Sequence, residues 1–539
     1  MLRNGQFMNS CKPLFIALLL AVCQPAFAQQ NRVITVDAGQ AKGAFNRSYN
    51  FCVGAGRANE GLRADWQRQL RLTRAGCGFR YIRFHGLLTD DMGVYQEDRR
   101  GNPVYNFQYI DELFDFLLSI NMKPFVELGF MPNALASGNK TVFWWRGNIT
   151  PPKDYQKWNG LIKHLVDHFT ERYGAAEVKT WYFEVWNEPN LKNLFFSGDQ
   201  ADYFKLYRET ANTIKSVSKD YRVGGPATAG NGWIPEMIGF CADNKVPVDF
   251  ISTHTYGVKQ GFLDQTGTTG VIVSQDKDAV AGDMLRVKQQ IKSSAMPNLE
   301  LHYTEWSASY TPSDPIHDSY FEAPYILDKI KKASGAVNSM SYWTFTDIFE
   351  EAGPRMTPFH GGFGLLNYQD IKKPAYYAFE FLNRLSDTEL KNNDENSIAC
   401  RDKNGNVQLL LWDFTITHPG DSVNDQVFYK RDLPAKTLGN ARISVKNLKP
   451  GTYKMYVYKT GYRANDAYAT YFDMHSPSQL TKQQVLQIKQ ANNGAPVVTT
   501  VKVPANGVFE KELPMRENDV YLVELKRLAP PNPPLKGGL

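Results

Sequence analysis

The chain has 539 residues, of which 61 are basic and 55 acidic, so its formal net charge is +6. A hydrophobic content of 42% and a charged content of 22% are those of an ordinary folded chain and exclude wholesale disorder. The basic residues form no concentrated block, which gives no support to nucleic-acid binding, and no apolar run approaches the ~20 residues of a membrane span. The length predicts two domains, one of them large.

Residues 1–28 have the pattern of a secretory signal peptide. Arg3 and Lys12 supply positive charge, Leu14–Cys23 is an apolar stretch, and Ala26-Phe27-Ala28 is a small-x-small cleavage pattern. The apolar stretch is too short to span a bilayer. We therefore expect cleavage after Ala28 and an exported protein, periplasmic or extracellular.

Between residues 48 and 386, short apolar runs alternate with helical patterns. The clearest helix is predicted over Tyr155–Tyr173, where apolar residues recur at i, i+3, i+4 and i+7 and Gly174 is placed to end the helix. Strands that alternate with helices pair in parallel through crossovers. The predicted strands are Tyr49–Ala55, Arg80–His85, Pro124–Phe130, Trp181–Glu188, Arg222–Ala227, Phe250–Tyr256, Leu301–Trp306 and Met340–Thr346.

Two α/β architectures alternate in this way, a closed barrel and an open doubly wound sheet. The doubly wound sheet would need G-x-G-x-x-G after its first strand, and Gly54–Asn59 breaks that spacing. Polar and aromatic residues gather at strand ends, as they do at the mouth of a barrel. The sequence therefore predicts a (β/α)₈ TIM barrel over residues 48–386, with these residues at its mouth: His85, Phe130, Glu188, His254, Tyr256 and Glu305.

After Ser386 the helical period disappears, and strand-like runs separated by turn residues predict a β-sandwich over residues 387–527. Residues 29–47 contain the run Val33–Asp37, which we expect to add a strand to that sandwich. Residues 528–539 are rich in Pro and Gly and predict a disordered tail. The sandwich runs are Ile398–Cys400, Val407–Phe414, Ala441–Leu448, Thr452–Lys459, Pro496–Val503 and Val520–Leu525.

Motifs for several kinds of chemistry are missing from the sequence. The nine histidines include no H-E-x-x-H, and the chain has neither G-x-S-x-G nor a P-loop. The cysteines that follow the signal peptide, Cys52, Cys77, Cys241 and Cys400, have no metal-binding spacing. We therefore expect no metal and no cofactor, and carboxylates remain as the candidate reactive groups.

Glu188 and Glu305 are the strongest candidates. Side chains alternate along a strand, so Glu184, Trp186 and Glu188 are predicted to point to one side, with Pro189 ending the strand at the mouth. Glu184 would lie deeper and pair with Arg80 or Arg83. Glu305 ends the seventh strand as Glu188 ends the fourth, so the two carboxylates would face each other across the mouth, as glycosidic-bond hydrolysis requires.

The sequence resembles glycoside hydrolase family 39, a clan A barrel family whose best-known bacterial members are β-xylosidases. The resemblance covers residues 33–527 and rests on an ordered set of motifs. These are Trp186-Asn187-Glu188-Pro189-Asn190, Thr304-Glu305-Trp306, Arg83-Phe84-His85-Gly86, Thr253-His254-Thr255-Tyr256, Tyr342-Trp343 with Glu350-Glu351, and Gly361-Gly362-Phe363-Gly364-Leu365.

The resemblance implies a retaining mechanism, with Glu188 as the acid/base residue and Glu305 as the nucleophile. Retention requires carboxyl groups only roughly 5–5.5 Å apart. The resemblance also implies that Asn187 hydrogen-bonds the sugar's 2-hydroxyl, and we expect Tyr256 or His254 to hydrogen-bond Glu305. The implied subsite for the non-reducing sugar comprises His85, Gly86, His254, Tyr256, Trp343, Glu350 and Glu351, and Phe130 is expected to join its wall.

The predicted function is that of an exported exo-glycosidase that acts on an oligosaccharide or glycoside, in the first place on β-xylosides. The sequence does not decide which sugar the enzyme accepts. β-Glucosidase and β-galactosidase are alternatives, as is α-L-iduronidase, for which Arg355 would contact a sugar carboxylate. A further alternative is a carbohydrate-binding protein without catalysis. Assembly into a homo-oligomer also stays open.

Overall fold

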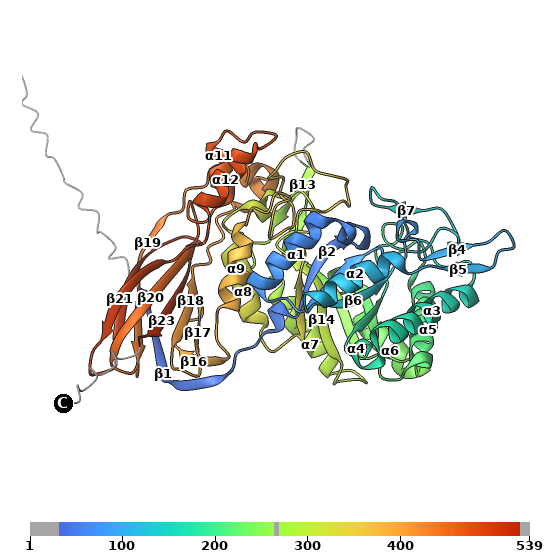
Figure 1. Ribbon diagram of the computed structural model, residues 1–539, viewed down its shortest axis with the longest axis horizontal. Coiled ribbons are helices and arrows are strands. Elements are labelled where there is room, and N and C mark those ends of the chain that lie inside the picture. The colour runs from blue at the N-terminus through green and yellow to red at the C-terminus, as the bar shows by residue number, and fades with distance from the viewer. Residues whose placement is uncertain (1–31, 264–268, 529–539) are drawn as a thin grey trace, which may run out of the picture.

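The computed structural model describes residues 32–263 and 269–528. The predicted signal peptide and residues 529–539 of the predicted tail lie outside them. The chain folds into a barrel and a separate, mostly β domain, which lie side by side in Figure 1. Among the described residues, no helix has both the length and the apolar character needed to cross a membrane.

The barrel is closed by eight strands in the order β10-β11-β14-β15-β2-β3-β6-β9, and neighbouring strands are parallel. Each predicted run overlaps one of these strands, so the TIM-barrel prediction is confirmed. Their bounds are β2 (Cys52–Arg57), β3 (Tyr81–His85), β6 (Lys123–Leu128), β9 (Tyr182–Val185), β10 (Arg222–Thr228), β11 (Phe250–Tyr256), β14 (Glu300–Ser307) and β15 (Ser339–Tyr342).

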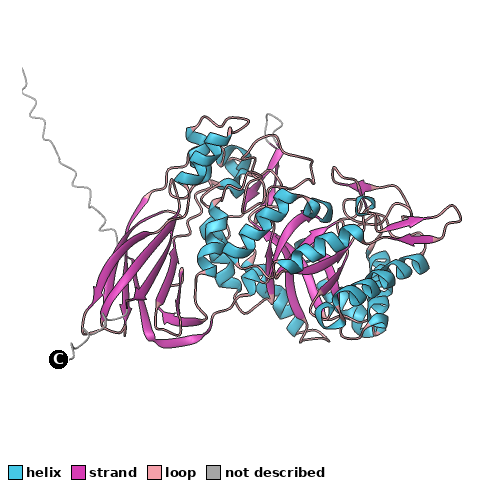
Figure 2. Cartoon of the chain, in the orientation of Figure 1, coloured by secondary structure: helices cyan, strands magenta, loops and turns pink. Residues whose placement is uncertain are grey.

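Helices cover the outside of the barrel (Figure 2). They are α1 (Ala64–Cys77), α2 (Gln108–Ser119), α3 (Tyr155–Tyr173), α4 (Ala175–Val178), α5 (Gln200–Val217), α6 (Ile234–Asn244), α7 (Ala281–Lys292), α8 (Glu322–Ala333) and α9 (Pro374–Asn383). Helix α3 has the predicted bounds, and its predicted apolar face is buried. Asp154 accepts hydrogen bonds from the backbone N–H groups of Gln156 and Lys157, which fixes the first turn of α3.

Three small hairpins extend from the loops between barrel elements. They pair β4 (Tyr95–Glu97) with β5 (Pro103–Tyr105), β7 (Thr141–Val142) with β8 (Gly147–Asn148), and β12 (Val258–Leu263) with β13 (Thr269–Val273). The third hairpin follows β11 directly, and Val258 at its start lines the central cavity.

The second domain is a nine-stranded sheet in the order β21-β20-β23-β18-β17-β16-β1-β19-β22. Buried residues from both halves of this order, among them Ile34, Leu409, Ile443 and Val523, share one apolar core, as the inner faces of a β-sandwich do. The strands are β1 (Arg32–Ala44), β16 (Thr388–Asn392), β17 (Ser397–Arg401), β18 (Val407–Trp412), β19 (Thr437–Lys446), β20 (Gly451–Thr460), β21 (Val497–Val503), β22 (Phe509–Arg516) and β23 (Val520–Arg527).

The first strand of the chain lies inside this sheet and not at its edge. Strand β1 pairs in parallel with β19, from Arg32 against Ala441 to Asp37 against Lys446, and antiparallel with β16 on its other side. In Figure 1 the blue β1 accordingly runs beside orange and brown strands. The sandwich is therefore built from both ends of the described chain, and the barrel is inserted between them.

The prediction that helices end at Ser386 was wrong. The structure adds α10 (Asp425–Phe428), α11 (Ala467–Asp473) and α12 (Lys482–Ala491) to the second domain. Of the ten residues in α12, Ile488 alone is buried, and Val485 packs beside it, so the apolar face of the helix is narrow. Ile488 and the buried Ala467 and Tyr471 of α11 pack with Phe359 and Ile371 from the barrel, in a cluster separate from the main cores.

Candidate active site

Arg83 of β3 lies at the centre of the barrel mouth, where it is fully buried. Its Nε donates to Glu184 Oε2 at 2.8 Å, and its Nη1 to Glu305 Oε1 at 2.5 Å. Its Nη2 donates to Asn187 Oδ1 at 2.9 Å and lies 2.8 Å from Glu127 Oε2. Arg83 is therefore the partner that Glu184 was predicted to need, and it also orients the carboxylate of Glu305 and the amide of Asn187.

Glu188 owes its position to a sharp change in the backbone after β9. The strand ends at Val185, and both Trp186 (φ 71°) and Glu188 (φ 44°) adopt the left-handed region. Such residues cost on the order of 1–3 kcal/mol each and persist only where the surroundings hold them. Here the Glu188 N–H donates to the Ala227 carbonyl of β10 at 2.8 Å.

The predicted alternation of Glu184, Trp186 and Glu188 is therefore wrong beyond Val185. The Trp186 indole is buried against Phe130 and Phe196, and its Nε1 donates to the Phe195 carbonyl at 2.8 Å. Glu188 instead lines the cavity at the mouth. The turn therefore separates the side chains of Trp186 and Glu188, which regular strand geometry would have placed on one face.

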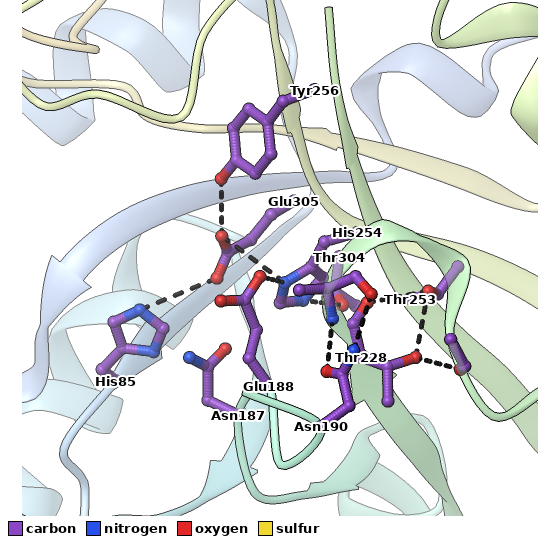
Figure 3. A network of polar contacts seen from close by, with 12 residues as sticks. His85, Asn187, Glu188, Asn190, Thr228, Thr253, His254, Tyr256, Thr304 and Glu305 are labelled. Atoms are coloured by element: carbon purple, nitrogen blue, oxygen red, sulfur yellow. Dashed lines mark hydrogen bonds and ion pairs between the residues drawn. The ribbon is translucent and has the colours of Figure 1, made fainter. Parts of the chain in front are cut away.

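Glu188 and Glu305 converge as Figure 3 shows. One oxygen of each carboxylate and a ring nitrogen of His254 all lie within 4.8 Å of one another. Glu305 Oε2 accepts a hydrogen bond from the Tyr256 hydroxyl at 2.6 Å, as was expected of Tyr256 or His254. His254 Nδ1 lies 3.6 Å from Glu305 but 2.8 Å from Glu188 Oε1, so its hydrogen bond is to Glu188.

The two carboxylates differ in their electrostatic surroundings. Burial raises the pKa of Glu188 to about 7, although the positive charges of His85 and Arg83 oppose that shift. Glu305, by contrast, accepts hydrogen bonds from a guanidinium and a phenol, both of which stabilise an ionised carboxylate. One group is thus suited to hold a proton near neutral pH and the other to be a charged nucleophile.

The two histidines at the mouth are perturbed in opposite directions. Burial disfavours the charged form of His85, but Glu127, 2.7 Å from Nδ1, outweighs it and the pKa of His85 rises to about 10. Burial lowers the pKa of His254 to about 4, so His254 is neutral at the pH where His85 is charged. His85 Nε2 lies 3.6 Å from both Glu305 Oε1 and Glu351 Oε1.

A cavity of about 640 Å³ opens above these groups, within the size range of small-molecule sites. Its lining combines carboxylates with the rings of Trp343, Tyr256 and Phe363 and with the apolar side chains of Leu191, Leu194 and Phe195. Seven predicted site residues line it: His85, Asn187, Glu188, Tyr256, Trp343, Glu305 and Glu351.

Residues 32–510 match the family model described as Glycosyl hydrolases family 39. The chain belongs to this family. It is 38% identical over 504 residues to a beta-xylosidase from Geobacillus stearothermophilus, covering 90% of this chain and 94% of that protein. The crystal structure of the GH39 enzyme from Xanthomonas axonopodis pv. citri superposes with a TM-score of 0.90 at 45% identity, over 94% of this chain and 100% of that one. A monomeric beta-xylosidase from Caulobacter crescentus CB15 gives 0.89 at 43% identity, over 92% and 100%.

The chain is therefore a glycoside hydrolase that acts on glycoside substrates. A Zn²⁺-like ion could be ligated in principle by Glu188, His254 and Glu305, whose donor atoms are close enough. However, Arg83 and Tyr256 already donate to the two oxygens of Glu305, and positive charge from Arg83 and His85 surrounds the group. The arrangement suits acid–base chemistry better than metal binding.

Four of the predicted site residues of this family 39 enzyme lie outside the cavity lining. His254 is buried behind Glu188, and Phe130 is buried against His85, Trp145 and Trp186. Gly86 has φ 70°, and a Cβ there would come within 3.3 Å of Trp145 and Thr89. His254, Phe130 and Gly86 thus pack against residues that line the cavity or lie next to its lining.

Glu350 is the fourth, and it differs from its neighbour Glu351. Its carboxylate pairs with Arg57 at 3.1 Å and with Arg63 at 2.9 Å, while its N–H donates to Glu60. Adjacent residues of a loop often point in opposite directions, and the tandem motif alone gave no means to choose between them. Glu351, which lines the cavity, is thus the member of the pair that can contact a sugar.

Sequence analysis missed several groups in the site. Glu127 of β6 pairs with both Arg83 and His85, yet it lies within an apolar strand with no motif around it. A lone carboxylate in such a run was the available signal, because buried charges need partners. Thr304, which the resemblance marked only as a motif position, connects Glu184 to His254. Cavity residues from later parts of the barrel were also missed, namely Asn231, Tyr310 and, from α7, Asp283 and Arg286.

Arg83→Met tests the role of Arg83 in this family 39 enzyme. The variant leaves Glu127, Glu184 and Glu305 without their shared cation, and breaking such a buried pair costs about 3–5 kcal/mol. We expect the free energy of unfolding, measured by urea denaturation, to fall by this amount.

Arg80→Met is the matched control. Arg80 is exposed, three residues earlier, and its guanidinium lies over the Phe51 ring at 5.0 Å from the centroid. Its loss should cost no more than about 1 kcal/mol. Equal losses in the two variants would contradict the central position given to Arg83.

Proposed function

We propose that the protein is an exported retaining exo-glycosidase that hydrolyses β-glycosides of neutral sugars, β-xylosides first, by double displacement. The observation that carries the proposal is the convergence of Glu188 and Glu305, with oxygens within 4.8 Å, on one cavity. Carboxyl groups this close leave no room for the water of an inverting mechanism and favour a covalent intermediate.

In the first step Glu188 acts as the general acid. Its O–H bond breaks as the proton passes to the leaving-group oxygen, and the bond between that oxygen and the anomeric carbon breaks while a Glu305 oxygen bonds to the carbon. A carboxyl with a pKa of about 7 holds this proton at neutral pH. Arg83 and Tyr256 hold Glu305 in position by hydrogen bonds to its two oxygens.

In the second step Glu188 acts as the base. Water gives a proton to Glu188, its oxygen bonds to the anomeric carbon, and Glu305 leaves as a carboxylate. The β configuration is thereby restored after two inversions. Asn187, whose Oδ1 accepts from Arg83, has its amide fixed beside the acid and is proposed to donate to the sugar's 2-hydroxyl.

The named relatives support β-xylosides as the substrate class. The cavity supports a neutral sugar, because Glu351 lines it beside Glu305 and would repel a uronate. Arg355, the residue considered for a sugar carboxylate, lies outside the cavity lining, which argues against an iduronidase-like specificity. A binding protein without catalysis is also disfavoured, because both carboxylates are present and aligned.

A panel of aryl glycosides tests the substrate. We expect turnover of aryl β-xyloside to exceed that of the β-glucoside, β-galactoside and α-L-iduronide, with release of β-xylose as the first-formed anomer by NMR. Release of the α-anomer would contradict retention. Turnover of none of these glycosides would contradict the enzyme proposal for this substrate class.

Substitution of each carboxylate tests the two roles. Glu188→Ala should lose about 10²–10⁴-fold in turnover of glycosides with poor leaving groups and much less with activated ones. Added azide should restore turnover and yield the β-glycosyl azide. Glu305→Ala should be inactive on every substrate and should give no β-product with azide. Equal, modest losses in both variants would refute the assignment.

The N-terminal segment supports the export part of the proposal, because its charge, apolar stretch and Ala26-Phe27-Ala28 pattern are those of a cleaved signal. We expect protein from the periplasm or medium of the producing cell to begin at Gln29, as intact-mass spectrometry would show. Full-length protein confined to the cytosol would contradict export.

A further inference from the structure

Thr304, which precedes Glu305 on β14, contacts two buried groups, Glu184 and His254, and Figure 3 shows it beside His254. Its Oγ1 lies 2.8 Å from Glu184 Oε1 and 3.1 Å from His254 Nε2. Thr304, Glu184 and His254 are all fully buried. The Thr304 hydroxyl has no role in the double displacement. The direction of its O–H bond determines which ring nitrogen of His254 carries a proton.

The hydroxyl of Thr304 carries one proton for two neighbours. Burial opposes ionisation of Glu184, but the positive charge of Arg83 outweighs it and lowers the pKa of Glu184. An ionised carboxylate can only accept, so the Thr304 O–H donates to Glu184. The Thr304 oxygen is then an acceptor toward His254, and the partner that fits is a protonated Nε2.

His254 is neutral and carries one proton, which this contact places on Nε2. Its Nδ1 therefore presents a lone pair. Glu188 Oε1 lies 2.8 Å away and Glu305 Oε2 lies 3.6 Å away. Two lone pairs would repel at 2.8 Å, so the proton between Nδ1 and Oε1 belongs to Glu188.

We propose that Thr304 is a positioning residue that holds His254 as its Nε2–H tautomer, so that Nδ1 accepts from Glu188 and keeps its carboxyl protonated until a leaving-group oxygen arrives. The inference rests on the proposed role of Glu188 as the acid. After the proton has passed to the leaving group, the lone pair of Nδ1 destabilises the carboxylate of Glu188. This raises its basicity toward the water of the second step.

Other charged groups act on Glu188 and His254, and a substitution of Thr304 leaves these charged residues in place. Arg83 and His85 of β3 favour ionised Glu188, and Glu127 of β6 disfavours it. His254 experiences Glu305, Glu184, Arg83 and His85. Tyr256 and Glu351 face Glu188 from the cavity side. A Thr304 variant removes the contacts of the hydroxyl with Glu184 and His254, and of these two groups His254 is the one hydrogen-bonded to Glu188.

Thr304→Val keeps the shape and the strand preference but removes the hydroxyl. Without an acceptor for Nε2–H, His254 adopts the Nδ1–H tautomer and donates to the carboxylate of Glu188. This stabilises the ionised form, so the basic limb of the pH profile of kcat/KM should move to lower pH by about one unit from the wild-type position near 7. The measurement uses a glycoside with a poor leaving group, for which the acid is needed.

Two further variants separate this effect from simple loosening of the barrel. Thr304→Ser restores the hydroxyl and should restore the wild-type limb. Thr253→Val is the matched control, because Thr253 is a buried threonine next to His254 whose hydroxyl donates to the Thr228 carbonyl at 2.8 Å. It should leave the limb in place. An unmoved limb in Thr304→Val, or an equal shift in Thr253→Val, would overturn the proposal.

The tautomer can also be read directly in the wild-type protein, without turnover. In two-bond ¹H–¹⁵N spectra of ¹⁵N-histidine-labelled enzyme, the His254 signals, assigned by their loss in His254→Gln, should show protonated Nε2 and bare Nδ1. Protonated Nδ1 would overturn the inference even if Thr304→Val does not fold. Azide rescue of Glu188→Ala tests the acid role of Glu188 separately. A failure of that role can therefore be distinguished from a failure of the proposed tautomer of His254.

Discussion

One buried guanidinium determines how the mouth of this barrel is arranged. Arg83 contacts Glu127, Glu184, Glu305 and Asn187, four side chains from β6, β9, β14 and the turn after β9. Several kcal/mol are needed to remove each such ion from water, and the interactions among them repay this only when every donor finds an acceptor. Each nitrogen of the Arg83 guanidinium has at least one acceptor, so Arg83 fixes the relative position of strands and of reactive groups at once.

The groups around Arg83 give two similar carboxylates different polar partners. Glu305 accepts hydrogen bonds from Arg83 and Tyr256, and Glu127 lies between Arg83 and His85. Glu188 instead has a neutral histidine beside it, and burial raises its pKa to about 7. The proposed division into acid and nucleophile thus rests on partners from neighbouring strands, not on the two glutamates themselves.

Periodicity in the sequence was sufficient to predict the barrel, because eight strand–helix units repeat the same pattern and their ends meet at one mouth. It was insufficient where the backbone departs from regular geometry. The left-handed backbone of Glu188 is held by its hydrogen bond to Ala227 of β10, and Trp186 is held by distant aromatic residues, which no local pattern encodes. Likewise, the distinction between Glu350 and Glu351 depends on Arg57 and Arg63, far away in the sequence. Helix α12 packs into a cluster that α11 and the barrel complete.

The place of β1 bears on how the molecule is made. Strand β1 lies between β16 and β19, and both of these strands follow the barrel in the sequence. The whole barrel is therefore synthesised before either pairing partner of β1. Until then its backbone donors and acceptors are unpaired, and such an edge can join strands of other nascent chains. The barrel, whose contacts are shorter in range, can form meanwhile and bring both ends of the sandwich near each other. Maturation of the second domain is therefore coupled to completion of the first.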